Sequence, residues 1–367
     1  MRNHLIRIVF ENAWRFAAVG NELYVGAGWF IVGWLLLTFL AWLWQGWESK
    51  EWIESAFAVG FWLFVPVVIF SLYWLQPNYE FIRDGIPIFG YGFMLFVGFS
   101  VAAWQAGRRV TAIGQHPDII WDMMMWALIP GFIGARMYYL IRHGSPEFET
   151  SSGLQKLIAA IALWDGGIVF YGSVIGGAVG IIAFCRLQKV PVLPMLDCLA
   201  PSLLVGEAFG RIGCFLYGCC YGSACSLPWA MRFPTDSLTF NKMLEKGQVT
   251  PDDLATPPLH PTQLYSSAAA FLMAWLLAWY FRRRRFDGAV LSLFAIIYPI
   301  SRWLLELLRA DIDPYRSGLK DAQIFSLLLL LAGCGGMYYF SRNRRLTQGS
   351  PPASSAGVLR PAAARPR

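Results

Sequence analysis

Charged residues are scarce in this sequence. Asp, Glu, Lys and Arg make up 14% of the 367 residues, whereas hydrophobic residues make up 56% and aromatic residues 16%. A mean hydropathy of +0.47 places the chain far from an average soluble domain. The composition therefore excludes an ordinary soluble fold and predicts a polytopic membrane protein.

A cleavable signal peptide is not expected either. The first apolar window begins near residue 26 without a small-residue cleavage site, so we expect this helix to be retained. Crossing a hydrocarbon core about 30 Å thick takes about 20 apolar residues of helix. The windows that qualify are 26–45, 55–76, 86–106, 119–141, 165–185, 192–216, 264–281, 288–308 and 322–340. The sequence thus predicts an all-α fold, a polytopic transmembrane helical bundle of about nine spans.

Clusters of arginine and lysine predict the orientation. Short basic loops such as Arg282–Arg285 mark the cytoplasmic side, which places the C-terminus inside and, with nine spans, the N-terminus outside. The arginines near the N-terminus then lie on the wrong side, and we expect an interfacial amphipathic segment there. The longest connection, about 217–263, becomes extracytoplasmic. The same side receives the helix ends that carry Tyr171, Arg211 and His260.

The excess of basic over acidic residues does not indicate that the protein binds nucleic acid. The net charge is +7, but the basic residues form short clusters beside apolar windows with no soluble domain to use them. Anionic lipid headgroups are the expected partner instead. The C-terminal tail is rich in Pro, Ala and Ser and too short and polar to bury a core, which predicts disorder.

Six local patterns follow one another along the apolar region. They are IPIFGYGFML at 86–95, IGARMYYL at 133–140, LWDGGIVFYGSVIGG at 163–177, DCLAPSLLVGEAFGRIGCFLYGCCYG at 197–222, HPTQLY at 260–265 and SRWLLELLRAD at 301–311. In their order and spacing, the patterns within about 86–341 resemble the prolipoprotein diacylglyceryl transferase family. The resemblance implies three parts: an N-terminal extension with two transmembrane helices (1–80), a seven-helix membrane domain (81–346) and a disordered cytoplasmic tail (347–367).

The resemblance implies an enzyme of the bacterial plasma (inner) membrane. Its reaction would move the diacylglyceryl group of phosphatidylglycerol to the lipobox cysteine thiol in the signal peptide of a preprolipoprotein and release glycerol phosphate. Such a reaction needs cations that hold the phosphate, a way to deprotonate a thiol of pKa about 8.5 and lateral access for two acyl chains. We expect no cofactor, no metal and an active cavity that faces outward.

Arg211 lies among the glycines and cysteines of GRIGCFLYGCCYG. A guanidinium at membrane depth costs roughly 2.5 to 3.5 kcal/mol, so such a residue usually faces a cavity and an anionic partner. By the resemblance, Arg211 binds phosphatidylglycerol and its leaving phosphate, for which the planar fork of arginine is suited. The alternative is a structural pairing with Glu207, four residues earlier.

Arg302, Glu306 and Arg309 are spaced to share one face of the eighth predicted helix. Arg302 and Glu306 match a pair of site residues in the family. Glu306 between two arginines is predicted to stay ionised, and to orient a guanidinium or accept a proton through water. The alternative is a packing network between helices without a chemical role.

Four further residues are candidates for substrate binding. Tyr91 matches a site residue of the family, with an interfacial belt tyrosine as the alternative. Arg136 lies in the middle of a window and is expected to be a second anion contact. His260 opens a helix whose free N–H groups attract anions, with a capping role as the alternative. Gly222 is expected to allow close approach of helices and lipid.

Three positions depart from the family's commoner pattern. Tyr171 stands where the family usually has histidine, and Cys214 and Cys219 stand where it usually has Asn and Glu. Since an unperturbed tyrosine has a pKa of about 10, it is a poor base at neutral pH. Either Tyr171 donates a hydrogen bond while another group takes the proton, or the acceptor differs. The rival interpretations are a relative with another acceptor or donor lipid, a catalytically silent lipid-binding protein and a transporter.

Four cysteines lie close together in the extracytoplasmic region, namely Cys214, Cys219, Cys220 and Cys225. Their spacing, C-x4-C-C-x4-C, is not a recognised zinc pattern, and adjacent cysteines rarely ligate one ion. A disulfide from Cys219 or Cys220 to Cys225 is an alternative on an oxidising side of the membrane. The default expectation is that they are free, small packing residues.

Overall fold

The fold is a helical membrane bundle with a small N-terminal sheet. A computed structural model describes residues 86–143, 169–309 and 321–343, and shorter stretches at 4–9, 16–19, 22–26 and between 29 and 43. The expected span 55–76, the beginning of the LWDGGIVFYGSVIGG pattern and the predicted tail 347–367 lie outside the described residues.

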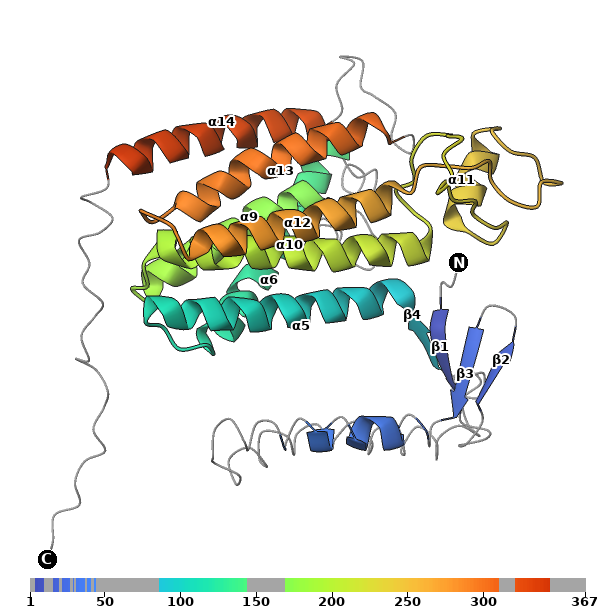
Figure 1. Cartoon of the computed structure of the whole chain (residues 1–367), viewed down its shortest axis with the longest axis horizontal. Helices are drawn as coiled ribbons and strands as arrows, with labels where there is room; N and C mark the ends of the chain where they lie inside the picture. The colour runs from blue at the N-terminus through green and yellow to red at the C-terminus, as the bar shows by residue number, and fades with distance from the viewer. Residues whose placement is uncertain are drawn as a thin grey trace, which may run out of the picture. The chain divides into compact units, whose positions relative to one another are not determined.

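Seven helices match, in order, the seven windows of the family-like region (Figure 1). They are α5 (Gly90–Val110), α6 (Ile119–His143), α9 (Phe170–Leu187), α10 (Val192–Tyr217), α12 (Thr262–Phe281), α13 (Ala289–Leu307) and α14 (Asp321–Arg342). Among the described residues, α6, α10, α12, α13 and α14 are long and apolar enough to cross a membrane, and α9 is a shorter apolar helix. The prediction of a helical membrane protein is confirmed. The count of nine spans stays a prediction.

The N-terminal segment adds a small sheet to this helical fold. Its strands, in the order β2-β3-β1-β4, are β2 (Phe16–Val19), β3 (Glu22–Gly26), β1 (His4–Val9) and β4 (Ile86–Phe89). Strand β1 runs parallel to β3 and antiparallel to β4. β-Branched residues in HLIRIV and IPIF favour extended backbone, and Pro87 is tolerated because β4 is an edge strand. The window that begins at residue 86 was predicted to be helical throughout, but its helix begins only at Gly90. Arg7, one of the arginines near the N-terminus, lies in strand β1.

The chain divides into two compact units. The first comprises residues 1–97, 209–265 and 308–311, and the second comprises 98–208, 266–307 and 312–367. Each unit contains part of the predicted site.

Glycines set the spacing of helices in the second unit. A Cβ added at Gly172 of α9 would collide with the carbonyl oxygen of Gly134 in α6. Helices α13 and α14 also approach closely, since a Cβ at Gly333 would lie 2.7 Å from the carbonyl carbon of Ala295. Small residues permit such contacts in a membrane, where van der Waals packing holds helices together. Gly172 thus permits the close contact between α6 and α9.

A buried carboxylate fixes the beginning of α13. Asp197 of α10 is fully buried and accepts hydrogen bonds from the backbone N–H groups of Gly288 (2.9 Å) and Leu291 (2.8 Å). Arg284 Nη1 lies 3.8 Å from Asp197 Oδ2 and balances part of its charge. A helix leaves its first N–H groups without intrahelical partners, so this carboxylate acts as a cap supplied from another helix.

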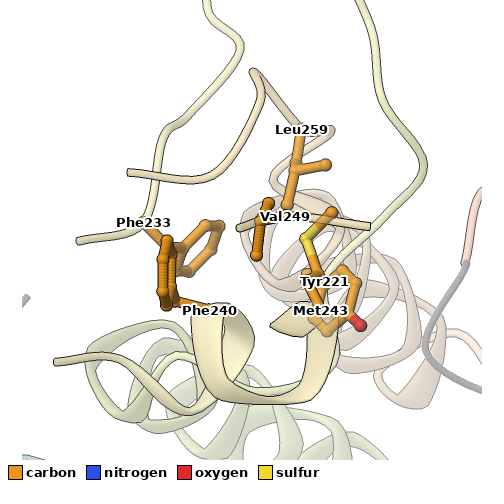
Figure 2. Close-up of a cluster of buried hydrophobic side chains, with 6 residues drawn as sticks. All are labelled: Tyr221, Phe233, Phe240, Met243, Val249 and Leu259. Carbon is orange, nitrogen blue, oxygen red and sulfur yellow. The ribbon is translucent and has the colours of Figure 1, made fainter. Parts of the chain in front are cut away.

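The connection between α10 and α12 is folded and contains its own small core in the first unit. It includes helix α11 (Leu238–Glu245), which Ser237 caps by accepting a hydrogen bond from the N–H of Phe240 at 3.2 Å. Met231 and Leu259 exchange two backbone hydrogen bonds of 2.9 Å each. The core side chains in Figure 2 are each at most 8% exposed; they are Tyr221, Phe233, Phe240, Met243, Val249 and Leu259.

Candidate functional site

Tyr91 lies against the end of α10 that carries Arg211. The ring centroids of Tyr91 and Tyr217 are 6.3 Å apart. A Cβ added at Gly213 would lie 3.0 Å from the Tyr91 ring and 3.3 Å from its backbone, so only glycine allows this approach of α5 and α10. Arg211 is also close enough to Tyr91 for an electrostatic interaction. Two of the predicted site residues are therefore neighbours.

The HPTQLY segment holds the loop that follows α10. Thr262 Oγ1 donates a hydrogen bond to the carbonyl of Cys220 (2.8 Å), and Gln263 Nε2 donates one to the carbonyl of Cys219 (2.6 Å). Gln263 is 1% exposed, so this amide lies inside the protein. Side chains at the beginning of α12 thus fix the backbone of both adjacent cysteines.

Gly222 and His260 are joined through their backbones. The N–H of Gly222 donates to the carbonyl of His260 at 3.1 Å, and a Cβ at Gly222 would lie 2.7 Å from the Cβ of His260. The His260 ring faces Tyr265, with Nδ1 3.4 Å from the Tyr265 hydroxyl, which also accepts a hydrogen bond from Trp229 Nε1 at 2.7 Å. The backbone of His260 therefore helps to hold the loop that follows α10, and its ring contacts Tyr265.

Three thiols converge in the same loop. The Sγ atoms of Cys214, Cys219 and Cys220 all lie within 4.8 Å of one another. Cys220 has a φ of +60°, a left-handed conformation that non-glycine residues seldom adopt. Neither Cys219 nor Cys220 lies in a helix or strand, and both adjacent thiols reach the Sγ atom of Cys214. The density of cysteines in the sequence was a sign of this cluster, although their spacing matches no recognised zinc pattern.

Two guanidinium groups lie within electrostatic range of these sulfurs. Hydrogen bonding with the other two thiols, together with the charges of Arg309 and Arg211, lowers the pKa of the Cys220 thiol. The alternative disulfide with Cys225 is not formed, because all seven cysteines are free thiols. Among the adjacent pair the thiolate is therefore favoured at Cys220, whereas hydrogen bonding with Cys214 and Cys220 raises the pKa of the Cys219 thiol.

Arg302 and Glu306 form a buried ion pair on α13 in the second unit. Arg302 Nη2 lies 2.7 Å from Glu306 Oε2, and Glu306 is 2% exposed. The other terminal nitrogen of Arg302, Nη1, is buried and has no hydrogen-bond partner within the described part of the chain. The predicted pair is thus present, with one donor of the guanidinium left for another acceptor.

Arg309 departs from the shared helix face that the sequence predicted. Helix α13 ends at Leu307, and the next residues pair with the loop after α10 in the first unit. Gly222 and Arg309 form an antiparallel bridge, and the N–H of Ser223 donates to the carbonyl of Leu308 at 2.9 Å. These backbone bonds end the helix before Arg309, which explains why its helical spacing from Arg302 does not apply.

Arg136 and Tyr171 have aromatic surroundings in the second unit. Arg136 is 8% exposed, and its guanidinium carbon lies 5.5 Å from the Tyr139 ring centroid, so it does not face lipid. The Tyr171 ring is 5.0 Å from that of Phe325 and 6.4 Å from that of Tyr138. Tyr171 of α9 thus packs between α6 and α14, a contact that the sequence did not predict.

Comparison with known proteins decides the family. The family model for prolipoprotein diacylglyceryl transferase matches residues 80–339. The chain belongs to this family. It is 34% identical to the phosphatidylglycerol–prolipoprotein diacylglyceryl transferase of Clostridium tetani over 249 residues, which cover 68% of this chain and 92% of that protein. It is 29% identical to the enzyme of that name from Thermosynechococcus vestitus over 263 residues, covering 71% and 90% of the two chains.

The predicted site residues of this family member fall into two sets. The first unit holds Tyr91, Arg211, Gly222 and His260. The second holds Arg136, Tyr171, Arg302 and Glu306. Each set contains a guanidinium of the kind that binds phosphate.

Proposed function

We propose that this chain transfers the diacylglyceryl group of phosphatidylglycerol to the lipobox cysteine thiol of preprolipoproteins and releases glycerol phosphate. The observation that carries the proposal is the family match over 80–339, a range that contains all the candidate site residues. The curated relatives are named for phosphatidylglycerol and prolipoprotein, and those two substrates fit an arginine-rich membrane protein.

Arg211 binds the phosphate of the donor lipid in this proposal. The thiolate sulfur attacks the glyceryl C3 carbon, the bond between C3 and the phosphate oxygen breaks, and its electron pair stays on the departing phosphate. Negative charge therefore grows on that oxygen in the transition state, where a guanidinium stabilises it more than in the ground state. Tyr91, which lies beside Arg211, contributes a hydroxyl group to this phosphate-binding region.

Arg302 provides a second guanidinium, oriented by Glu306. The 2.7 Å ion pair fixes the plane of the guanidinium, and the buried Nη1 can donate a further hydrogen bond. A phosphate oxygen is a suitable acceptor because charge-assisted bonds to guanidinium are strong. The buried Arg136 is a further candidate anion contact in that unit.

We also place the protein in the bacterial plasma (inner) membrane with nine spans, the C-terminus in the cytoplasm and the active cavity facing outward. Within the described ranges, five helices long and apolar enough to span a membrane support the multi-pass arrangement. The orientation rests on the basic loops, of which Arg282–Arg285 after α12 is the strongest.

Complementation tests the function directly. A cell depleted of its own diacylglyceryl transferase should regain growth and the mobility shift of a reporter lipoprotein when it expresses this chain. Purified protein should transfer label from phosphatidylglycerol to a lipobox peptide. Arg283→Ala, which removes an arginine stacked on Trp279 outside both site sets, serves as the matched control and should act like the wild type.

Other results would favour the rival functions. Transfer from another phospholipid, or to another acceptor, would identify a relative with altered substrates. Phosphatidylglycerol bound without turnover would identify a silent lipid-binding protein, and solute flux in proteoliposomes would identify a transporter.

A further inference from the structure

The three converging thiols have the dimensions of a zinc site. A tetrahedral zinc ion with Zn–S bonds of about 2.3 Å needs sulfur atoms about 3.8 Å apart. The Sγ atoms of Cys214, Cys219 and Cys220 already lie within 4.8 Å of one another, so small side-chain rotations bring them to that spacing. Thiolates are the ligands that soft cations prefer.

The backbone around these thiols is fixed before any ion binds. The carbonyls of Cys219 and Cys220 are held by Gln263 and Thr262, and Cys220 is kept in its left-handed conformation. Strain of this kind is retained at functional sites when the surroundings enforce it. The usual objection to adjacent cysteines as joint ligands does not hold for this loop, because its conformation places both sulfurs on one side.

The charges and the ligand count point to an open site. Three thiolates and one divalent cation carry a single net negative charge, which the nearby Arg211 and Arg309 compensate. Within the described ranges, no fourth His, Cys, Asp or Glu atom joins the cluster. Structural zinc sites are closed by four protein ligands, whereas catalytic sites use three and leave one position for water or substrate.

We propose that Cys214, Cys219 and Cys220 hold a Zn²⁺ ion whose fourth position binds the acceptor thiol, an inference that rests on the proposed function. Binding to zinc releases the thiol proton to water and leaves a thiolate. Its sulfur then forms the bond to the glyceryl C3 carbon while the C3–O bond breaks and the pair of electrons leaves with glycerol phosphate. The ion supplies the deprotonation for which Tyr171 is unsuited, and no oxidant or reductant is needed.

Metal analysis of the full-length protein in detergent tests the site without reference to activity. The protein should contain about one zinc per chain, as three-ligand sites do. Cys214→Ser and Cys220→Ser should lose this zinc, and Cys225→Ser should keep it as the matched control. Cobalt exchanged for zinc in the unmutated protein should show thiolate charge-transfer absorption. That spectrum should change when a lipobox peptide is added, and stay unchanged with the same peptide carrying serine in place of cysteine.

Activity separates this inference from the proposed function. Chelation should abolish transfer and added Zn²⁺ should restore it. Full activity in metal-free protein, a disulfide among the three cysteines in protein taken from the membrane, or a cobalt spectrum that ignores the thiol peptide would each overturn the zinc site. A cobalt spectrum that responds to the thiol, with no transfer from phosphatidylglycerol, would instead leave the zinc site in place and reject the proposed reaction.

Discussion

The two terminal nitrogens of Arg302 have different surroundings. Nη2 is paired with Glu306 at 2.7 Å, whereas Nη1 is buried and has no hydrogen-bond partner among the described residues. An unsatisfied buried donor costs about 1 to 3 kcal/mol, more for a charged group. A ligand oxygen that reaches Nη1 recovers this free energy. Such an arginine is prepared for an anion, and its carboxylate partner keeps it in position.

Arg302 and Glu306 are expected to act as one unit. Removing either partner leaves the other charge buried and unpaired, which costs about 3 to 5 kcal/mol when a buried pair is broken. We therefore expect Arg302→Ala, Glu306→Ala and the double variant to lose diacylglyceryl transfer to a similar extent. Steady-state kinetics of the purified variants measure this, with thermal unfolding as the control for folding. Losses that add in the double variant would show two independent roles.

Arg211→Lys tests whether charge alone is enough for the phosphate. Lysine keeps the cation but loses the two parallel N–H donors of guanidinium. Losing one charge-assisted hydrogen bond of about 1.5 to 3 kcal/mol predicts a fall in kcat/KM of roughly 10-fold to 100-fold. The control is Arg283→Lys, at the arginine that stacks on Trp279. A wild-type rate for Arg211→Lys would exclude the role of Arg211 as a phosphate clamp.

Tyr171→His introduces the residue that the family resemblance predicts at this position. The Tyr171 ring packs 5.0 Å from Phe325, and replacing it loses an aromatic contact of about 0.5 to 1.5 kcal/mol. We expect the variant to fold and to transfer lipid at least as fast as the wild type, because histidine also offers a polar tip. Turnover of lipobox peptide between pH 6 and 9 is the measurement. Lost activity in a stable protein would mean that the site has been rebuilt around the phenol.

At the level of helices and strands, the sequence predicts the elements that depend on local composition and misses those that depend on distant partners. Runs of about 20 apolar residues predicted the seven helices α5, α6, α9, α10, α12, α13 and α14, because a helix satisfies its own backbone groups in lipid. Strand β4 was missed because its partner β1 lies about 80 residues earlier in the sequence. The sequence drew attention to four neighbouring cysteines, but which three thiols meet depends on how the loop after α10 folds. Arg309 left the predicted helix face because α13 ends at Leu307.

Gly172→Ala tests the contact between α6 and α9. The added Cβ would collide with the carbonyl oxygen of Gly134, so the helices must separate. We expect a lower unfolding temperature in detergent even though alanine raises helix propensity by about 1 kcal/mol. Gly335→Ala is the matched control, because nothing lies within 4 Å of a Cβ added there. An equal or higher unfolding temperature for Gly172→Ala would contradict the packing.

At the scale of the whole molecule, the protein combines a family core with an N-terminal extension. The family model begins at residue 80, and the Clostridium tetani relative is matched over 92% of its length but covers 68% of this chain. The extension is nevertheless joined to the core, because β1 pairs with β4 in the register Ile6 to Ile88. Strand β4 leads directly into α5, where Tyr91 lies two residues beyond its end. The extension therefore supports the part of the core that carries one of the site residues.

Removing residues 1–79 is expected to leave transfer in place and to weaken the binding of phosphatidylglycerol. The family core keeps every candidate catalytic residue, so kcat should change little, whereas β4 without β1 holds the beginning of α5 less firmly and KM should rise. Two causes could raise KM in the deletion variant: loss of the sheet or loss of the predicted spans. Ile6→Pro separates them, because proline in the central strand β1 removes ladder hydrogen bonds without deleting the predicted spans. If the sheet supports Tyr91, Ile6→Pro should raise KM as the deletion does. A raised KM in the deletion alone would assign the effect to the predicted spans instead, and complete loss of kcat in a folded deletion variant would show that the extension belongs to the catalytic machinery.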